Sequence, residues 1–92
     1  MDRVREQILR AAIAHYGRGP QQLKAIEELS ELIQALAKAD DPDNIAEEMA
    51  DVRIMLDQLE LMFDNHSRVR QYEFRKLQRL NLRTKAATEV GP

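Results

Sequence analysis

The sequence contains no cysteine among its 92 residues. Disulfides, thiolate zinc sites and cysteine nucleophiles are therefore excluded, and the composition fits a reducing compartment. The longest apolar runs are only a few residues, so we expect no signal peptide, no membrane span and a cytoplasmic location. No segment alternates apolar and polar residues for long enough to predict a strand. What is present is a short, highly charged chain with helical patterning.

The length predicts a single domain with a small core. A domain of this size buries only a modest fraction of its surface, so we expect it to associate with another copy. We predict an all-α fold, with four helices in a single domain over residues 1–87 and a bundle completed by dimerisation. A tail of small residues at 88–92 should fray.

Apolar residues at helical spacing and the breaks between them give the expected helix bounds. Gly17 to Pro20 is the first break, with Pro20 suited to the first position of the next helix. Asp41 is an expected N-cap, followed by Pro42 at the first helical position. The four helices are expected at about Asp2 to Tyr16, Gln21 to Lys38, Pro42 to Phe63 and Arg68 to Lys85.

Charge is segregated along the chain. Gln22 to Asp64 holds twelve acids against three Lys or Arg, whereas His66 to Ala87 holds seven Lys or Arg against Glu73 alone. A chain that needed charge only for solubility would mix positive and negative side chains along each surface. This segregation therefore indicates that the two regions face each other or share a ligand. A purely intramolecular charge complement is the simpler alternative.

Two acidic strings, EELSE and EEMAD, lie on consecutive expected helices. Glu28 precedes Glu31 by three residues, and Glu48 precedes Asp51 by three. This spacing puts each pair on one side of its helix. Two such pairs can converge on one cation.

Glu48 is placed inside an apolar stripe by the helical period of about 100° per residue. An ionised carboxylate there is costly unless it is neutralised, paired with a cation or bound to a metal. A salt bridge to a buried Arg or Lys is the alternative to a metal. The stripe consists of Ile45, Met49, Val52, Met55, Leu56, Leu59, Met62 and Phe63.

The acids of the preceding helix give a weaker signal. Glu27, Glu28 and Glu31 lie opposite the centre of a wide apolar arc, so taken alone they indicate a solvated face. Paired with a second acidic string on the next helix, they indicate a site. The arc consists of Leu23, Ile26, Leu29, Leu32, Ile33, Leu36 and Ala37, and its width suggests contacts on two sides.

Carboxylates without histidine or cysteine at ligand spacing favour hard cations, chiefly Mg²⁺ or Mn²⁺. A di-iron bundle would need Glu-x-x-His pairs, and neither His15 nor His66 follows a glutamate by three residues. These two histidines are better explained as capping or interface residues. Mg²⁺ sites usually leave coordination positions for water and substrate phosphates, which points to a phosphorylated substrate.

The last helix carries a basic stripe that could hold a polyphosphate. Tyr72, Lys76, Arg79 and Arg83 recur at i, i+4, i+7 and i+11. Cations at such a position would neutralise charge on a leaving group. The alternative is a set of surface cations that pair with acids of a neighbouring helix or subunit. The acidic middle of the chain argues against a nucleic-acid footprint.

EELSELIQAL followed by EEMADV resembles the EExxE and ExxD motifs of the all-alpha nucleoside triphosphate pyrophosphohydrolases, and the chain is similar to a short MazG-like member. The resemblance covers roughly Gln21 to Arg83. It implies a helical bundle completed by dimerisation or by pairing of dimers. It also implies Mg²⁺-dependent hydrolysis of a nucleoside triphosphate between the α and β phosphates, giving a monophosphate and pyrophosphate.

Residue by residue, the resemblance implies that the metal ligands are Glu28, Glu31, Glu48 and Asp51. Glu27 and Glu47, which lead the two acidic doublets, would hold a second metal or orient the attacking water.

For the substrate, the resemblance implies that Lys76, Arg79 and, as a weaker match, Arg83 contact phosphates, with Gln22 and Lys24 as further candidates for nucleotide contact. The chain has no tryptophan, so the large aromatic platform of many family members is absent. A non-catalytic helical dimer, whose acids only form salt bridges, is the alternative.

Overall fold

The chain folds into helices joined by short links. In a computed structural model, residues 1–90 are described, with side chains described for residues 1–85. The helices are α1 (Arg3–Tyr16), α2 (Arg18–Ala37), α3 (Pro42–Phe63) and α4 (His66–Val90). Residues 1–90 contain no strand, so the all-α prediction is confirmed. No helix within them is long and apolar enough to span a membrane.

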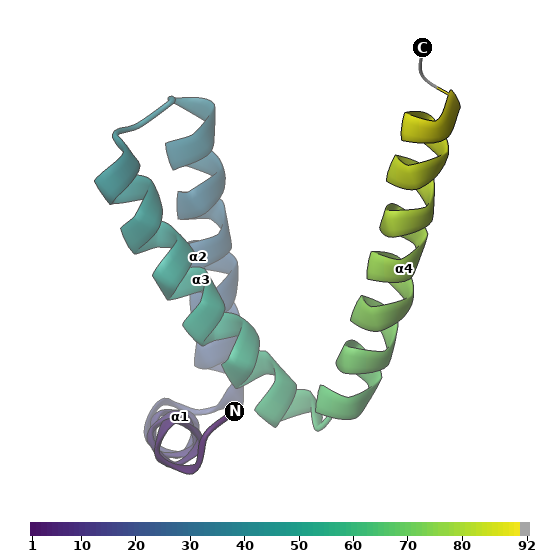
Figure 1. Cartoon of the computed structure of the whole chain (residues 1–92). Helices are drawn as coiled ribbons and strands as arrows, with labels where there is room; N and C mark the ends of the chain where they lie inside the picture. Colours follow the sequence, from purple (N-terminus) through teal and green to yellow (C-terminus); the bar gives the residue numbers. More distant parts are fainter. Residues whose placement is uncertain (91–92) are drawn as a thin grey trace.

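The helices are arranged as a V. α2 and α3 lie side by side as an antiparallel hairpin, and α1 crosses one end of this hairpin (Figure 1). α4 diverges from the hairpin beyond the short link that follows α3 (Figure 1). The hairpin is therefore the unit that can position side chains from two helices against each other.

Capping residues start two helices where the sequence predicts. Asp2 Oδ1 accepts a hydrogen bond from the Arg5 N–H at 2.8 Å, and Asp41 Oδ1 accepts one from the Asn44 N–H at 3.0 Å. Pro42 occupies the first helical position after the Asp41 cap. Each cap satisfies an N–H group that has no partner within its helix.

The expected start of α2 at Gln21 is wrong by one turn. The break is Gly17 alone, whose φ of 94° lies in the region that favours glycine, and the helix begins at Arg18. Pro20 lies within the first turn, where backbone N–H groups lack intrahelical acceptors, so its missing N–H costs no hydrogen bond.

The link between α3 and α4 is short and hydrogen-bonded. Asp64 adopts a left-handed conformation, with φ 49° and ψ 47°, and its N–H donates to the Glu60 carbonyl. α4 then begins at His66 rather than at Arg68. It continues to Val90, so the expected tail from residue 88 overlaps its last turn, and Gly91 and Pro92 lie outside the described residues.

The core lies between α2 and α3 and is closed at one end by α1. The side of α2 that faces α3 is the one that carries Glu28, and the small side chains of Ala25 and Ala35 allow close approach of the helices. The buried residues are Leu9 of α1, Gln21, Ala25, Glu28 and Ala35 of α2, and Val52, Met55, Gln58 and Met62 of α3.

The apolar arc predicted for α2 is mostly outside this core. Leu23, Ile26, Ile33 and Leu36 are between 57% and 68% exposed. The predicted stripe of α3 is divided in the same way, because Val52, Met55 and Met62 are buried whereas Met49, Leu56 and Phe63 are about half exposed. The contact between α2 and α3 therefore uses the acidic side of one helix and only part of the apolar stripe of the other.

Candidate metal centre

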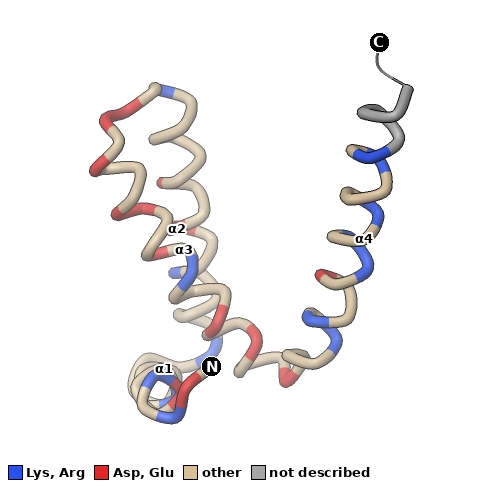
Figure 2. Tube along the Cα trace, viewed as in Figure 1, with Lys and Arg blue, Asp and Glu red and all other residues tan. Residues whose placement is uncertain are grey.

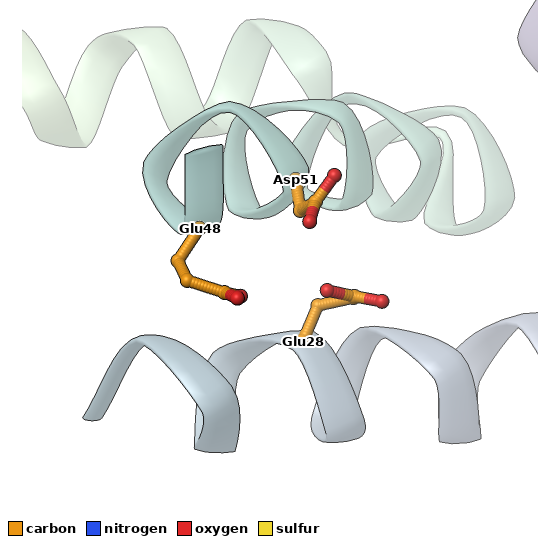
Figure 3. Close-up of side chains that lie close together, drawn as sticks. All are labelled: Glu28, Glu48 and Asp51. Atoms are coloured by element: carbon orange, nitrogen blue, oxygen red, sulfur yellow. The ribbon is translucent and has the colours of Figure 1, made fainter. Parts of the chain in front are cut away.

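Three carboxylates from the two helices of the hairpin meet in its interior. Glu28 of α2 points toward Glu48 and Asp51 of α3 (Figure 3). One oxygen atom from each lies within 4.8 Å of the other two. The antiparallel packing of α2 and α3 thus brings the two acidic strings together.

The cluster is partly removed from water. Glu28 is only 8% exposed, and Glu48 and Asp51 are half-buried. The Oε2 atoms of both Glu28 and Glu48 are buried and have no hydrogen-bond partner. Buried carboxylate oxygens without partners are strongly unfavourable when ionised, so this arrangement calls for protons or a cation.

Lys24, which lies on α2 as Glu28 does, contacts the cluster through an ion pair. Its Nζ lies 3.1 Å from Glu28 Oε1 and 3.6 Å from Glu27 Oε2. Hydrogen bonding to Glu28 and the negative charge of Glu27 raise the pKa of Lys24. One ammonium group cannot neutralise all the carboxylates, and it leaves Oε2 of Glu28 unpaired.

Glu31 belongs to the same electrostatic group although its oxygens are not among the three that converge. The charge of Glu28, then desolvation and the charge of Glu48, raise the pKa of Glu31. Desolvation, then the charges of Asp51 and Glu28, raise the pKa of Glu48, while hydrogen bonding to Glu31 opposes that shift. Carboxyl groups whose pKa values are raised by burial and by neighbouring like charges are typical of a site that binds a proton or a metal ion.

The donor set fits a hard divalent cation. All the converging atoms are carboxylate oxygens, which suit Mg²⁺ and Mn²⁺. Neither histidine is within the cluster. His66 instead joins α4 to α3, with its Nδ1 2.6 Å from Glu60 Oε2 and its Nε2 accepting from Arg70 Nε at 3.4 Å.

The other acids of the two strings lie at the rim. Glu27 and Glu47 are exposed. The interpretation of the acidic side of α2 as a solvated face is therefore wrong for Glu28 and consistent with the exposure of Glu27. Helix contact, rather than the apolar arc, decides which of these acids is buried.

The basic stripe of α4 is not brought to the carboxylates within one chain. Tyr72, Lys76, Arg79 and Arg83 are exposed on the diverging helix. Within the described side chains, no Lys or Arg of α4 forms a salt bridge with an acid of α2 or α3. Among the nucleotide-contact candidates of α2, Gln22 is exposed and Lys24 pairs with Glu28.

Two buried glutamines were not among the predicted site residues. Gln58 is 3% exposed and its Oε1 has no hydrogen-bond partner, and Gln21 is 8% exposed. Gln58 follows Asp51 by seven residues, which places it on the same side of α3 two turns further on. That spacing was the available signal for a polar group on the buried side of the helix.

Comparisons of the chain with protein-family models, with curated proteins and with solved structures found no match.

Proposed function

We propose that this chain is a Mg²⁺-dependent nucleoside triphosphate pyrophosphohydrolase of the MazG-like type. It would cleave an NTP or dNTP between the α and β phosphates to a monophosphate and pyrophosphate, removing unwanted nucleotides in the cytoplasm. The observation that carries the proposal is the convergence of Glu28, Glu48 and Asp51, with two buried oxygens that have no partner.

The carboxylates fit Mg²⁺, with Mn²⁺ as a substitute. Glu28, Glu48 and Asp51 would hold the ion. Glu31, whose pKa is raised by the charge of Glu28 and then by desolvation and the charge of Glu48, would serve as a fourth ligand. When bound, Mg²⁺ lowers the pKa of a coordinated water and screens the negative charge of the phosphates. The remaining steps belong to side chains at the rim.

Glu27 and Glu47 are suited to accept the proton of the attacking water, or to hold a second ion. Both are exposed and each directly precedes a cluster residue in the sequence, so each is a candidate for that role. Lys24, already beside Glu28, is the cation that could contact a phosphate from the same chain.

The other proposed substrate contacts are Gln22 at the start of the acidic helix and Tyr72, Lys76, Arg79 and Arg83 on α4. α4 diverges from the hairpin, and the contact between His66 and Glu60 ties the start of α4 to α3. We therefore assign the α4 side chains to phosphates held by another chain of a dimer or a dimer of dimers. Those cations would offset charge on the leaving pyrophosphate.

The test is an assay against canonical and modified nucleoside triphosphates, with Mg²⁺ and with a chelator. We expect pyrophosphate and a monophosphate from at least one substrate, only in the presence of the metal. Release of inorganic phosphate and a diphosphate would place the cleavage elsewhere. Absence of pyrophosphate with every substrate would defeat the proposal.

A non-catalytic helical module is the second candidate, and the Lys24 to Glu28 contact of 3.1 Å favours it. In this interpretation Lys24 is the structural counter-ion of Glu28, and the other acids stay protonated or solvated. The two candidates differ in how strongly removal of Lys24 destabilises the chain.

A further inference from the structure

α4 carries most of its positive charge on one side. Five of its seven Lys and Arg residues fall within a sector of about 100° when each residue advances by about 100° around the helix. Tyr72 lies inside that sector, whereas Arg70 and Lys85 lie outside it. The five residues form the basic face of α4, and they are Arg68, Arg75, Lys76, Arg79 and Arg83.

The cations of the basic face have no acidic partners. All five are exposed, and none of them forms a salt bridge within the described side chains. Arg75, Arg79 and Arg83 follow one another at a spacing of four, where like charges destabilise a helix. This arrangement therefore calls for a partner that carries several negative charges in a row.

The acids of the chain do not cover the basic face. Most acidic positions of the upper hairpin lie on the side away from α4 (Figure 2). Glu73, the only acid among residues 66–85, lies about 100° around the helix from Tyr72. The acidic middle of the chain is thus separated from the basic face, which removes the main objection to a nucleic-acid partner.

The length and chemistry of the basic face fit a chain of phosphates. Arg68 and Arg83 are separated by about 22 Å along the helix axis, at about 1.5 Å per residue. The three phosphates of a single nucleotide reach only part of such a row, whereas a nucleic-acid strand presents phosphates along all of it. Four of the five cations are arginines, whose planar guanidinium groups match phosphate oxygens in pairs.

Tyr72 favours a single strand over other polyanions. Its side chain is 54% exposed among the cations, and the guanidinium group of Arg75 lies 5.9 Å from the centre of its ring. Unpaired bases stack on exposed aromatic rings and on guanidinium planes. The bases of a duplex already stack on one another, so a duplex would leave the Tyr72 ring unused.

An anionic membrane fits this helix less well. A helix that lies on a membrane buries its apolar side in the lipid. The apolar side of α4 instead faces the hairpin at its start, where Val69 lines a groove of about 380 Å³ together with Leu56 and Leu59 of α3. A bilayer could not reach that side without displacing α3.

We infer that α4 binds a single strand of nucleic acid along its basic face, with the phosphates on the cations and a base stacked on Tyr72. Strand binding requires neither a metal ion nor hydrolysis, so it goes beyond the proposed function and does not rest on it. Tyr72, Lys76, Arg79 and Arg83 would contact a nucleotide or a strand, whereas Arg68 and Arg75 would contact the strand alone.

The test is the fluorescence anisotropy of a labelled oligonucleotide strand, measured with a chelator present and at several salt concentrations. The logarithm of the affinity should fall with the logarithm of the salt concentration with a slope of about −3.5, since five phosphate contacts contribute about −0.7 each. Arg68→Gln/Arg75→Gln should weaken binding by roughly tenfold or more at low salt and make the slope shallower by about 1.4.

The matched control is Arg70→Gln/Lys85→Gln, which removes the same charge from outside the basic face. It should weaken binding by less than roughly threefold and leave the slope nearly unchanged. Circular dichroism checks that α4 stays helical in both variants, which is expected because glutamine and arginine have similar helix propensities.

Tyr72 is tested by its own pair of variants. Tyr72→Ala should weaken binding of the strand by roughly tenfold without changing the salt slope, because stacking releases no counterions. Tyr72→Phe keeps the ring and should bind as wild type does. Equal losses from both variants would show that the hydroxyl group, and not stacking, makes the contact.

Several outcomes would overturn the inference. They are the absence of strand binding by wild type at low salt, equal losses from the two arginine-containing pairs, and tighter binding to the duplex of the same sequence. Binding to vesicles of phosphatidylserine and phosphatidylcholine without binding to the strand would also overturn it. An active pyrophosphohydrolase that binds no strand would keep the proposed function and remove this inference, and strand binding by a protein inactive on every nucleotide would do the reverse.

Discussion

The α2–α3 hairpin and α4 differ in what each leaves unsatisfied. The hairpin buries the side of α2 that carries Glu28 and brings three carboxylates together without enough cations. α4 buries none of its residues from Arg70 to Lys85 and carries an excess of cations. The hairpin therefore calls for protons or a cation, and α4 calls for a surface that covers its exposed apolar side chains. Metal binding and self-association are therefore proposed together.

Neutralising Glu48 should give the largest effect on the hairpin. Glu48→Gln should lower the proposed activity by roughly a hundredfold or more, because it removes a metal ligand. The same change should raise the thermal stability of the metal-free chain, because it removes a carboxyl group whose pKa is raised by desolvation and whose charged form is therefore unfavourable. Activity and melting temperature are the two measurements.

The control for this variant is Asp43→Asn, which removes an exposed acid from the first turn of the same helix. It should leave the activity unchanged. Intact activity of a folded Glu48→Gln variant would show that Glu48 does not hold the metal, and a large loss of stability would contradict the expected gain.

The contrast in packing can be tested by truncating one apolar side chain in each region. Met55→Ala should cost about 2–4 kcal/mol of unfolding free energy, because Met55 is only 7% exposed in the core of the hairpin. Leu77→Ala should cost less than about 0.5 kcal/mol in dilute, monomeric protein, because Leu77 is 58% exposed there. Urea unfolding at low and high protein concentration is the measurement.

At high concentration the cost of Leu77→Ala should grow, because the dimer interface is then occupied. If Leu77→Ala costs as much as Met55→Ala at every dilution, α4 packs within its own chain and the contrast between the two regions disappears.

Removing Lys24 distinguishes the two candidate functions with a smaller effect. If the cluster binds Mg²⁺, Lys24→Met should change stability in the presence of Mg²⁺ by no more than about 1 kcal/mol and should raise the affinity for the ion, because Lys24 competes for Glu28. If Lys24 is the structural counter-ion, its loss should be strongly destabilising, since Glu28 is left buried and unpaired. Thermal unfolding with and without Mg²⁺ separates these results.

The pH dependence of stability should be the smallest effect. The folded pKa values of Glu31 and Glu48 are raised above the ordinary value of 4.5, so the folded chain holds these protons more tightly than the unfolded chain. Their contribution to stability therefore falls as the pH rises from 4.5 through the folded pKa values, and then levels off. Urea unfolding of the metal-free protein from about pH 5 to about pH 8 measures it.

The double variant Glu31→Gln/Glu48→Gln provides the reference for that profile. It should show a flatter dependence than wild type over the same range, because the other carboxylates contribute equally to both. Parallel profiles would mean that the two groups do not titrate differently in the folded chain.

Much of the helical fold could be predicted from the sequence. The caps at Asp2 and Asp41 and the end of α3 at Phe63 follow from local chemistry, which neighbouring helices do not change. The start of α2 was missed because Gly19 and Pro20 were taken as breakers, although a helix tolerates both in its first turn.

The orientation of α2 could not be predicted in the same way. A helical wheel identifies the most apolar side, but it does not say which partner covers that side. In this chain the apolar arc stays exposed in the single chain, and Glu28 takes the inner position. For α3 the prediction that Glu48 lies within an apolar stripe agrees with the half-burial of Glu48 and the burial of Val52 and Met55, because that stripe does face the neighbouring helix in part.

The central claim is that the carboxylates of the hairpin bind a divalent cation. Titrating the protein with Mn²⁺ and following the EPR signal of the free ion counts the bound ions directly. We predict at least one Mn²⁺ per wild-type chain, displaced by excess Mg²⁺, and none in a Glu28→Gln/Glu48→Gln variant of unchanged helical content. Absence of binding by wild type, or equal binding by the double variant, would contradict the claim.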